Sequence, residues 1–400
     1  MEYVKGKPYF SCGEIKIKQY PYLTKSASCD ILIVGGGIDG AIANYFLSQK
    51  YDTMLVDKSR FGYGCTSCAT ALCEYQLDDF AADLSAVLKN KEIVMAYKLG
   101  LKSIDKIAKF VEKHGNNCHF SKRPTFLYTD SKFLDKRIFE EYEFRKEYDF
   151  DCQLITDADN PFNFEVSSGI YVADGGCELN PYLFAKQMIE SSKNQDKIFE
   201  HTHIISLEKQ QNCILAKTAF GETICCKKVI VATGFNWEFI KKEEICERFI
   251  SYSIVTNVVD FQWFNRALIH DVKSPYHYLR LLPDNRIIFG GEDTKFKPGP
   301  IDQKKANKKY KKLFEDLCKM FPNHKDKLKV EYEFCGCFGA TENNLGVIGK
   351  SSFDDDILMF ISCGANGIIN AMIGVELIDD ILQNKPNEYQ KIFSPSREVF

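Results

Sequence analysis

The feature that most constrains the fold is a glycine-rich turn between two apolar runs. Residues 30–59 read DILIVGGGIDGAIANYFLSQKYDTMLVDKS, in which an apolar run leads into Gly35 and a second apolar run ends at Asp57. A strand, a glycine turn, a helix and a second strand are typical of a Rossmann-type unit. In such a unit Gly35 permits the tight turn, Gly37 lets the backbone approach a pyrophosphate, and Gly40 lets helix and strand pack closely.

The spacing Gly35-x-Gly37-x-x-Gly40 predicts a dinucleotide site. The first turn of the helix offers backbone N–H groups and the positive end of its dipole to an anion. Asp57 stands close to where an acid binds a ribose hydroxyl. Asp39 is unexpected, because a carboxylate repels a pyrophosphate. An acid is nevertheless favoured in the first turn of a helix, so we expect Asp39 to belong to the cofactor loop with its carboxylate turned away from the phosphates.

Length and composition limit the number of domains, the kind of partner and the location of the protein. The chain has 400 residues, a formal charge of -3 and 45% hydrophobic residues, which favours a globular protein of two or three domains without a nucleic-acid partner. Residues 357–375 carry no charge over about the length of a membrane span, but their three glycines favour a buried strand, a turn and a helix, so we expect no transmembrane segment. The N-terminus lacks an apolar signal region, which favours a cytoplasmic protein.

The sixteen cysteines are expected to be reduced thiols. Cys65-x-x-Cys68 and Cys335-x-Cys337 have metal-like spacing, but neither has a matching second pair. We therefore predict no metal site.

The order of the patterns predicts an α/β fold, α+β overall. Strand–turn–helix patterns stand near both ends of the chain, and antiparallel strand patterns fill residues 250–293. We predict a Rossmann-like cofactor-binding domain built from the non-contiguous residues 29–80, 155–235 and 336–400. A mainly antiparallel substrate domain of residues 81–154 and 236–335 is inserted into it, and residues 1–28 form an N-terminal arm.

The glycine loop, VDKSRFGYGCTS at 56–67, KKVIVATG at 227–234 and CGANGI at 363–368 together resemble the FAD-dependent oxidoreductases of the D-amino-acid oxidase superfamily, of the glycine oxidase and sarcosine oxidase type. The resemblance runs from about residue 20 to the C-terminus. The segment at 69–79 is more similar to an uncharacterised bacterial branch of that superfamily. The resemblance implies FAD as cofactor and flavin-dependent oxidation as chemistry.

Carried over residue by residue, the resemblance implies a set of FAD-binding positions. Asp57 stands where the family more often has Glu, and the turn at 364–368 would face the flavin pyrimidine. The residues implied are Gly35, Gly37, Ile38, Asp39, Gly40, Asp57, Lys58, Cys65, Thr66, Ser67, Ile204, Ala232, Thr233, Gly234, Gly364, Ala365, Asn366, Gly367 and Ile368. Sarcosine oxidases attach flavin through a Cys at the position of Gly336, so the resemblance implies non-covalent FAD here.

The substrate side is predicted from a strand pattern. Arg280, in YHYLRLLPDNR, lies on a strand that resembles the family's substrate-facing strand, and Tyr278 shares its face. An Arg can grip a carboxylate in a bidentate fork, although Arg280 could equally lie at the surface or against the flavin. Glu74 could receive a substrate ammonium or could lie in a solvated loop. We name Arg280, Tyr278 and Glu74 as candidate catalytic residues.

These observations predict an enzyme that takes a hydride from the C–H next to nitrogen of a small amine or amino acid onto flavin N5. Oxygen or a quinone would then accept the electrons. Two alternatives remain: an FAD-dependent 2-hydroxy acid or polyol dehydrogenase, and a non-catalytic flavin subunit that relays electrons.

Overall fold

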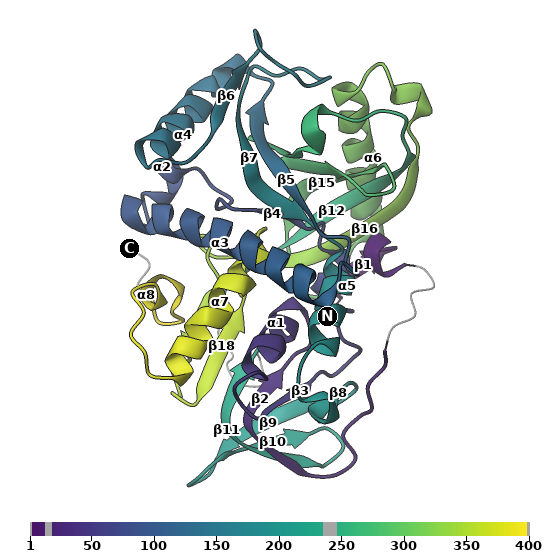
Figure 1. The fold of residues 1–400 in the computed structure, drawn as a ribbon. Helices are drawn as coiled ribbons and strands as arrows, with labels where there is room; N and C mark the ends of the chain where they lie inside the picture. Colours follow the sequence, from purple (N-terminus) through teal and green to yellow (C-terminus); the bar gives the residue numbers. More distant parts are fainter. Residues whose placement is uncertain (1, 13–17, 235–245, 398–400) are drawn as a thin grey trace.

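The computed structural model describes residues 2–12, 18–234 and 246–397. Residues 13–17 of the expected arm, and residues 235–245 where one expected domain boundary falls, lie outside the described residues. Two sheets organise the described chain, with the smaller sheet in the lower half of Figure 1 and the larger sheet in the upper half.

The smaller sheet has eight strands and contains the glycine turn. Its order is β17-β18-β11-β2-β3-β8, and the pairs from β18 to β8 are all parallel. Its strands are β2 (Ala27–Val34), β3 (Thr53–Val56), β8 (Ile198–Phe199), β9 (Ile204–Lys209), β10 (Ile214–Thr218), β11 (Thr223–Val231), β17 (Val347–Lys350) and β18 (Ile357–Ile361).

Four helices surround the core between the sheets. Helix α1 packs against α5 and α7, and α3 packs against α7 and crosses the middle of the molecule (Figure 1). Gly115, with a φ of 87°, ends α3, and Asn180 caps α5 ahead of a proline in its first turn. The helices are α1 (Ile38–Leu47), α3 (Asn90–His114), α5 (Pro181–Glu190) and α7 (Gly367–Leu382).

The larger sheet has ten strands, in the order β1-β16-β12-β15-β14-β13-β5-β7-β4 with β6 beside β7. Every pair is antiparallel except β13 with β5. Its strands are β1 (Val4–Gly6), β4 (Leu72–Glu74), β5 (Ser121–Thr129), β6 (Gln153–Thr156), β7 (Ser168–Glu178), β12 (Glu247–Val258), β13 (Leu268–Asp271), β14 (His277–Leu281), β15 (Arg286–Lys295) and β16 (Val330–Ala340).

Four further helices lie at the periphery. Helix α6 covers β12 and β15, and α4 packs against α2 and β7. These helices are α2 (Ala81–Leu84), α4 (Asp135–Glu147), α6 (Gln303–Met320) and α8 (Gln390–Phe393). Among the described residues, no helix has the length and apolar character needed to cross a membrane. Residues 357–375 form β18, a turn and the start of α7, as the glycines indicated.

The predicted fold class is confirmed: a parallel Rossmann-like sheet from distant segments stands beside a mainly antiparallel sheet. The proposed domain boundaries stay a prediction, and strand pairing differs from them at several strands, among them β16, which crosses the proposed boundary at residue 336. Strands β4 and β7 lie in stretches that we placed with the cofactor domain, yet they pair within the larger sheet. Strand β1 of the arm joins that sheet through β16.

Candidate active site

A cavity of about 1080 Å³ is lined by residues of both sheets. This volume lies at the upper end of the range of about 300–1,000 Å³ that is usual for small-molecule sites. It is suited to a dinucleotide with a small substrate beside it. The predicted site residues that line it are Gly35, Gly37, Ile38, Asp39, Asp57, Lys58, Cys65, Thr66, Glu74, Ile204, Ala232, Thr233, Gly234, Tyr278, Gly364, Ala365, Asn366, Gly367 and Ile368.

The glycine turn is shaped by close backbone approaches. A Cβ on Gly40 would lie 1.7 Å from the carbonyl oxygen of Gly35, so only glycine lets α1 pack this close to β2. Gly35 itself has a φ of 110°, where side chains are strained. Gly37 opens α1 without a side-chain cap, and its Cβ position would lie 3.3 Å from Thr66 Oγ1. Gly40 does not line the cavity, so it packs the turn, whereas Gly37 faces the space.

Two acids hold this region in different ways. Asp57 accepts hydrogen bonds from the backbone N–H groups of Gly36 and Ser59, each at 2.7 Å, and burial raises its pKa while these bonds lower it. The Asp39 carboxylate accepts from the backbone N–H of Ser362 at 3.1 Å and from its hydroxyl. Burial raises the pKa of Asp39 to about 6, against the lowering effect of those bonds. The carboxylate of Asp39 is thus engaged by the end of β18.

The final glycine turn connects the cofactor region to the part of the cavity lining that carries the predicted substrate residues Glu74 and Tyr278, which we call the substrate wall. Asn366, at the start of α7, accepts from the Glu74 backbone N–H at 3.0 Å and donates to the Gln76 carbonyl at 2.9 Å. The backbone N–H of Ala365 donates to Asp78 at 2.7 Å. Residues 74–78 are therefore fixed by the turn that the family resemblance assigns to the flavin ring.

The residues present fit a flavin dinucleotide. The Thr233 hydroxyl is buried without a hydrogen-bond partner among the described residues, beside the glycine turn. The Ser67 hydroxyl, by contrast, donates to the Gly64 carbonyl at 2.9 Å, and Ser67 does not line the cavity. A glycine cradle, a helix N-terminus and an unused hydroxyl are together suited to a pyrophosphate-containing ligand.

The cysteines near the cavity are poor nucleophiles. All sixteen are free thiols, and Cys65, Cys68, Cys73 and Cys337 line the cavity. Burial raises the pKa of Cys65 to about 12 and moves that of Cys337 higher still. Because the thiolate is the reactive form, this environment supports non-covalent attachment of the cofactor, which stays a prediction.

Glu74 forms a buried carboxylate–imidazole pair on the substrate wall. Its Oε2 lies 2.9 Å from His270 Nδ1 and accepts from Gln76 at 2.6 Å. Burial alone would lower the pKa of His270, but the charge and hydrogen bond of Glu74 raise it overall. Glu74 Oε1 is buried without a partner among the described residues. The alternative of a solvated loop for Glu74 is therefore wrong, since the residue is 5% exposed.

Tyr278 lies on β14, and its side chain also lines the cavity. Its hydroxyl is 2.9 Å from Ser251 Oγ and 3.5 Å from Ser253 Oγ, and burial raises its pKa to about 12, so it stays protonated. Tyr276 and Asp293 line the cavity nearby. This side therefore offers hydroxyl groups and a carboxylate to a ligand.

Arg280 requires a correction, because the structure does not place it in the cavity. It is 1% exposed and pairs with Glu178 at 2.9 Å. Its other donors reach the carbonyls of Thr70 and Leu179, each at 2.9 Å. The strand alternation was right, since Tyr278 and Arg280 share a face, but the segment after residue 68 covers Arg280. It is a structural residue, not a carboxylate anchor.

Among the residues that line the site without having been sequence candidates are His270, Asp78 and Asp293. Asp78 lies in the segment at 69–79 that the resemblance had singled out, and Asp293 lies on β15. His270 stands in the short strand β13, in the stretch ALIHD, whose pairing with Glu74 depends on the parallel contact of β13 with β5. No local sequence signal indicates that contact.

A parallel sheet whose glycine turn opens toward a large cavity is typical of dinucleotide-binding proteins. The family model described as FAD dependent oxidoreductase, DAO, matches residues 30–380. The chain belongs to this family, and its cofactor is FAD.

Individual relatives are distant but cover nearly the whole chain. Gamma-glutamylputrescine oxidoreductase of Escherichia coli (strain K12) is 22% identical, over 95% of this chain and 90% of the relative. Glycine oxidase of Bacillus subtilis (strain 168) is also 22% identical, over 89% of this chain and 93% of the relative. The crystal structure of glycine oxidase from Geobacillus kaustophilus superposes with a TM-score of 0.78 at 15% identity, covering 93% of this chain and all of that one, which shows the shared fold.

A substitution in the glycine turn tests the cofactor site. Gly37→Asp should abolish FAD binding, because a side chain and a negative charge would project from Gly37 into the cavity past Thr66. FAD per chain is measured from the absorbance of the purified, then denatured, protein. A variant that keeps wild-type FAD content and its circular dichroism would show that the phosphates lie elsewhere.

A second substitution tests the role of Arg280. Arg280→Met should destabilise the fold by about 1–3 kcal/mol, because it leaves one oxygen of the buried Glu178 carboxylate without its partner while Arg123 still pairs with the other. Arg137→Met, which breaks an exposed pair with Asp83, should cost about 0–1 kcal/mol. Urea unfolding of both variants measures the difference. Unchanged stability with a selective loss of carboxylate substrates would return Arg280 to the site.

Proposed function

We propose that this chain oxidises a small amine or amino acid at the C–H next to nitrogen and passes a hydride to its flavin. FAD supplies the hydride acceptor in this chemistry. The protein must bind the nitrogen, accept the extra proton of an ammonium so that the nitrogen lone pair can form the C=N bond as the hydride leaves, and orient the C–H bond. Oxygen or a quinone is proposed as the final acceptor.

The observation that carries the proposal is the second carboxylate oxygen of Glu74. Its Oε2 is held by His270 and Gln76, while Oε1 is buried in the cavity lining without a hydrogen-bond partner among the described residues. A buried acceptor without a partner is costly, so a donor from a ligand is favoured at this position. An ammonium group supplies both the donors and the opposite charge.

The charge balance of the wall supports a cationic ligand. The basic side chains on this side each have a carboxylate partner: Arg137 with Asp83, Arg145 with Glu141 at 2.8 Å, Lys273 with Asp130 at 2.6 Å, and His270 with Glu74. Asp78 and Asp293 add acid to the lining, and no ion pair is recorded for either among the described residues. With Arg280 also paired, the wall holds surplus negative charge once Asp78 and Asp293 are ionised, which favours substrates whose nitrogen is protonated over those held mainly by a carboxylate.

The two alternatives make different demands on the same wall. A 2-hydroxy acid or polyol brings no positive charge and would leave the surplus acid uncompensated. A subunit that only relays electrons does not need the buried, unpartnered oxygen of Glu74 beside the turn at 364–368. A steady-state screen of amines, amino acids and hydroxy acids, under oxygen and under an artificial acceptor, separates these functions, because the relay function predicts no turnover with any small substrate.

Replacement of Glu74 tests the ammonium site directly. Glu74→Gln should lower kcat/KM for the best amine about ten- to a hundredfold, because it removes a charge-assisted contact of about 1.5–3 kcal/mol. FAD content should stay near that of the wild type. Glu165→Gln, at an exposed carboxylate, is the matched control and should leave kcat/KM unchanged. Equal activity of both variants on amines would remove Glu74 from the substrate site.

The pH dependence gives an independent test. Burial raises the pKa of Asp78 to about 7, against the opposing effect of the Ala365 N–H bond. The carboxyl is therefore neutral below about pH 7 and negative above it. For a cationic amine, kcat/KM should rise as the pH passes through about 7, and Asp78→Asn should flatten this limb. An unchanged pH profile in the variant would assign the limb to another group.

A further inference from the structure

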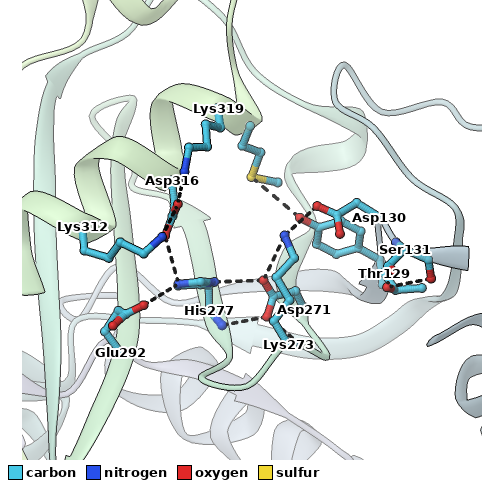
Figure 2. A network of polar contacts seen from close by, with 12 residues as sticks. Thr129, Asp130, Ser131, Asp271, Lys273, His277, Glu292, Lys312, Asp316 and Lys319 are labelled. Atoms are coloured by element: carbon cyan, nitrogen blue, oxygen red, sulfur yellow. Dashed lines mark hydrogen bonds and ion pairs between the residues drawn. The ribbon is translucent and has the colours of Figure 1, made fainter. Parts of the chain in front are cut away.

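A second cluster of ionisable side chains lies outside the cavity, where α6 covers the larger sheet. His277 opens β14, Glu292 lies on β15, and Asp316 lies on α6 (Figure 2). His277 Nε2 is 3.7 Å from Glu292 Oε1 and 3.7 Å from Asp316 Oδ2. The three ligand atoms lie within 4.8 Å of one another.

The distances in this cluster are too long for direct hydrogen bonds. His277 Nε2 is buried without a hydrogen-bond partner among the described residues, and the residue is 8% exposed. Two atoms that each bind one ion at about 2.1 Å, with angles of about 110–120°, lie roughly 3.4–3.6 Å apart. The imidazole nitrogen thus lies close to the spacing expected, from each of the two carboxylate oxygens, for ligands that share one cation.

The histidine is already oriented for this role. Its Nδ1 lies 3.0 Å from Asp271 Oδ2, and its backbone N–H donates to Asp271 Oδ1 at 2.8 Å. With the proton assigned to Nδ1, the lone pair of Nε2 points at Glu292 and Asp316. A carboxylate behind the second ring nitrogen is the usual support of a metal-binding histidine.

The surrounding lysines mainly contact Glu292 Oε2 and Asp316 Oδ1, the carboxylate oxygens that are not the ones nearest to His277 Nε2. Lys309 donates to Glu292 Oε2 at 2.6 Å, and Lys312 and Lys319 donate to Asp316 Oδ1 at 2.9 and 3.0 Å. Lys312 also lies 2.8 Å from Oδ2, but its side chain is 47% exposed and can turn to solvent. Glu292 Oε1 and Asp316 Oδ2 are left facing the histidine.

Glu292 has a left-handed backbone conformation at the point where β15 changes register. Glu292 has a φ of 57°, in the left-handed region where residues other than glycine are uncommon. The pairing of β12 with β15 shifts register nearby. Glu292 thereby contacts His277, while its neighbour Asp293 lines the cavity. Strained backbone of this kind concentrates at functional sites.

We propose that His277, Glu292 and Asp316 bind a divalent transition-metal ion, for which Zn²⁺ is best suited. One imidazole and two carboxylates match its preference for nitrogen and oxygen ligands, with a fourth position left for water. The ion would clamp α6 to the β14–β15 hairpin, directly behind Tyr276 and Tyr278 of the substrate wall. The site revises the sequence expectation of no metal, and it is independent of the proposed function.

The test uses FAD-loaded, chelator-treated protein titrated with ZnCl₂, with bound zinc counted by elemental analysis after dialysis. We expect about one zinc per chain and a zinc-dependent rise in Tm. His277→Gln and Asp316→Asn should each weaken zinc binding at least tenfold. Glu315→Gln, at the exposed neighbour on α6 that pairs with Lys311, is the matched control and should bind as the wild type does.

Each other outcome overturns the proposal. Absence of stoichiometric zinc in the wild type would mean that His277 only bridges the two carboxylates as a cation. Equal zinc binding by all variants would place the metal at the free thiols. FAD content and circular dichroism confirm that each variant is folded, so that weaker zinc binding reports the site.

Discussion

The buried contact between Asp39 and Ser362 is the interaction on which the cofactor site depends. It joins the first turn of α1 to the end of β18, two segments at opposite ends of the chain. Because the first glycine turn leads into α1 and the final glycine turn follows β18, one carboxylate ties the two turns together. The sequence presents this residue as an anomaly, an acid beside a phosphate site. The structure gives it a reason: a small buried acceptor is needed where two backbone turns meet, and burial keeps its pKa high.

The substrate wall rests on a second buried charge. Glu178 accepts from Arg280 through one oxygen and from Arg123 through the other. This network fixes β14 and β7 with the segment that follows Thr66. The strand that carries Tyr278 is therefore fixed by an ion pair outside the cavity. The residues of this region that line the cavity are hydroxyl groups and acids. Along this one strand, Arg280 is held in the buried ion pair while Tyr278 lines the cavity.

The sequence predicted most of the cofactor half because its signals are local. A glycine turn between a strand and a helix needs only neighbouring residues, and Gly35, Gly37 and Asp57 all lie where the spacing placed them. The substrate half depends on which strands meet. The parallel contact of β13 with β5 brings His270 to Glu74, and the segment after η2 (Cys65–Cys68) covers Arg280. Neither contact leaves a periodic pattern in the chain. The strand pattern therefore favoured Arg280, which does not line the cavity, as the residue that would bind a substrate carboxylate.

The N-terminal strand has a consequence for how the molecule meets its neighbours. Strand β1 is only three residues long, yet it covers the end of the larger sheet by pairing with β16. Gly6 approaches so closely that a Cβ would lie 2.2 Å from the Glu333 carbonyl oxygen. A bare edge of an antiparallel sheet is a template for pairing with another chain. The short arm therefore pairs residues 333–337 in the middle of β16 from within the same chain, which shortens the stretch of this edge that is open to pairing with another chain.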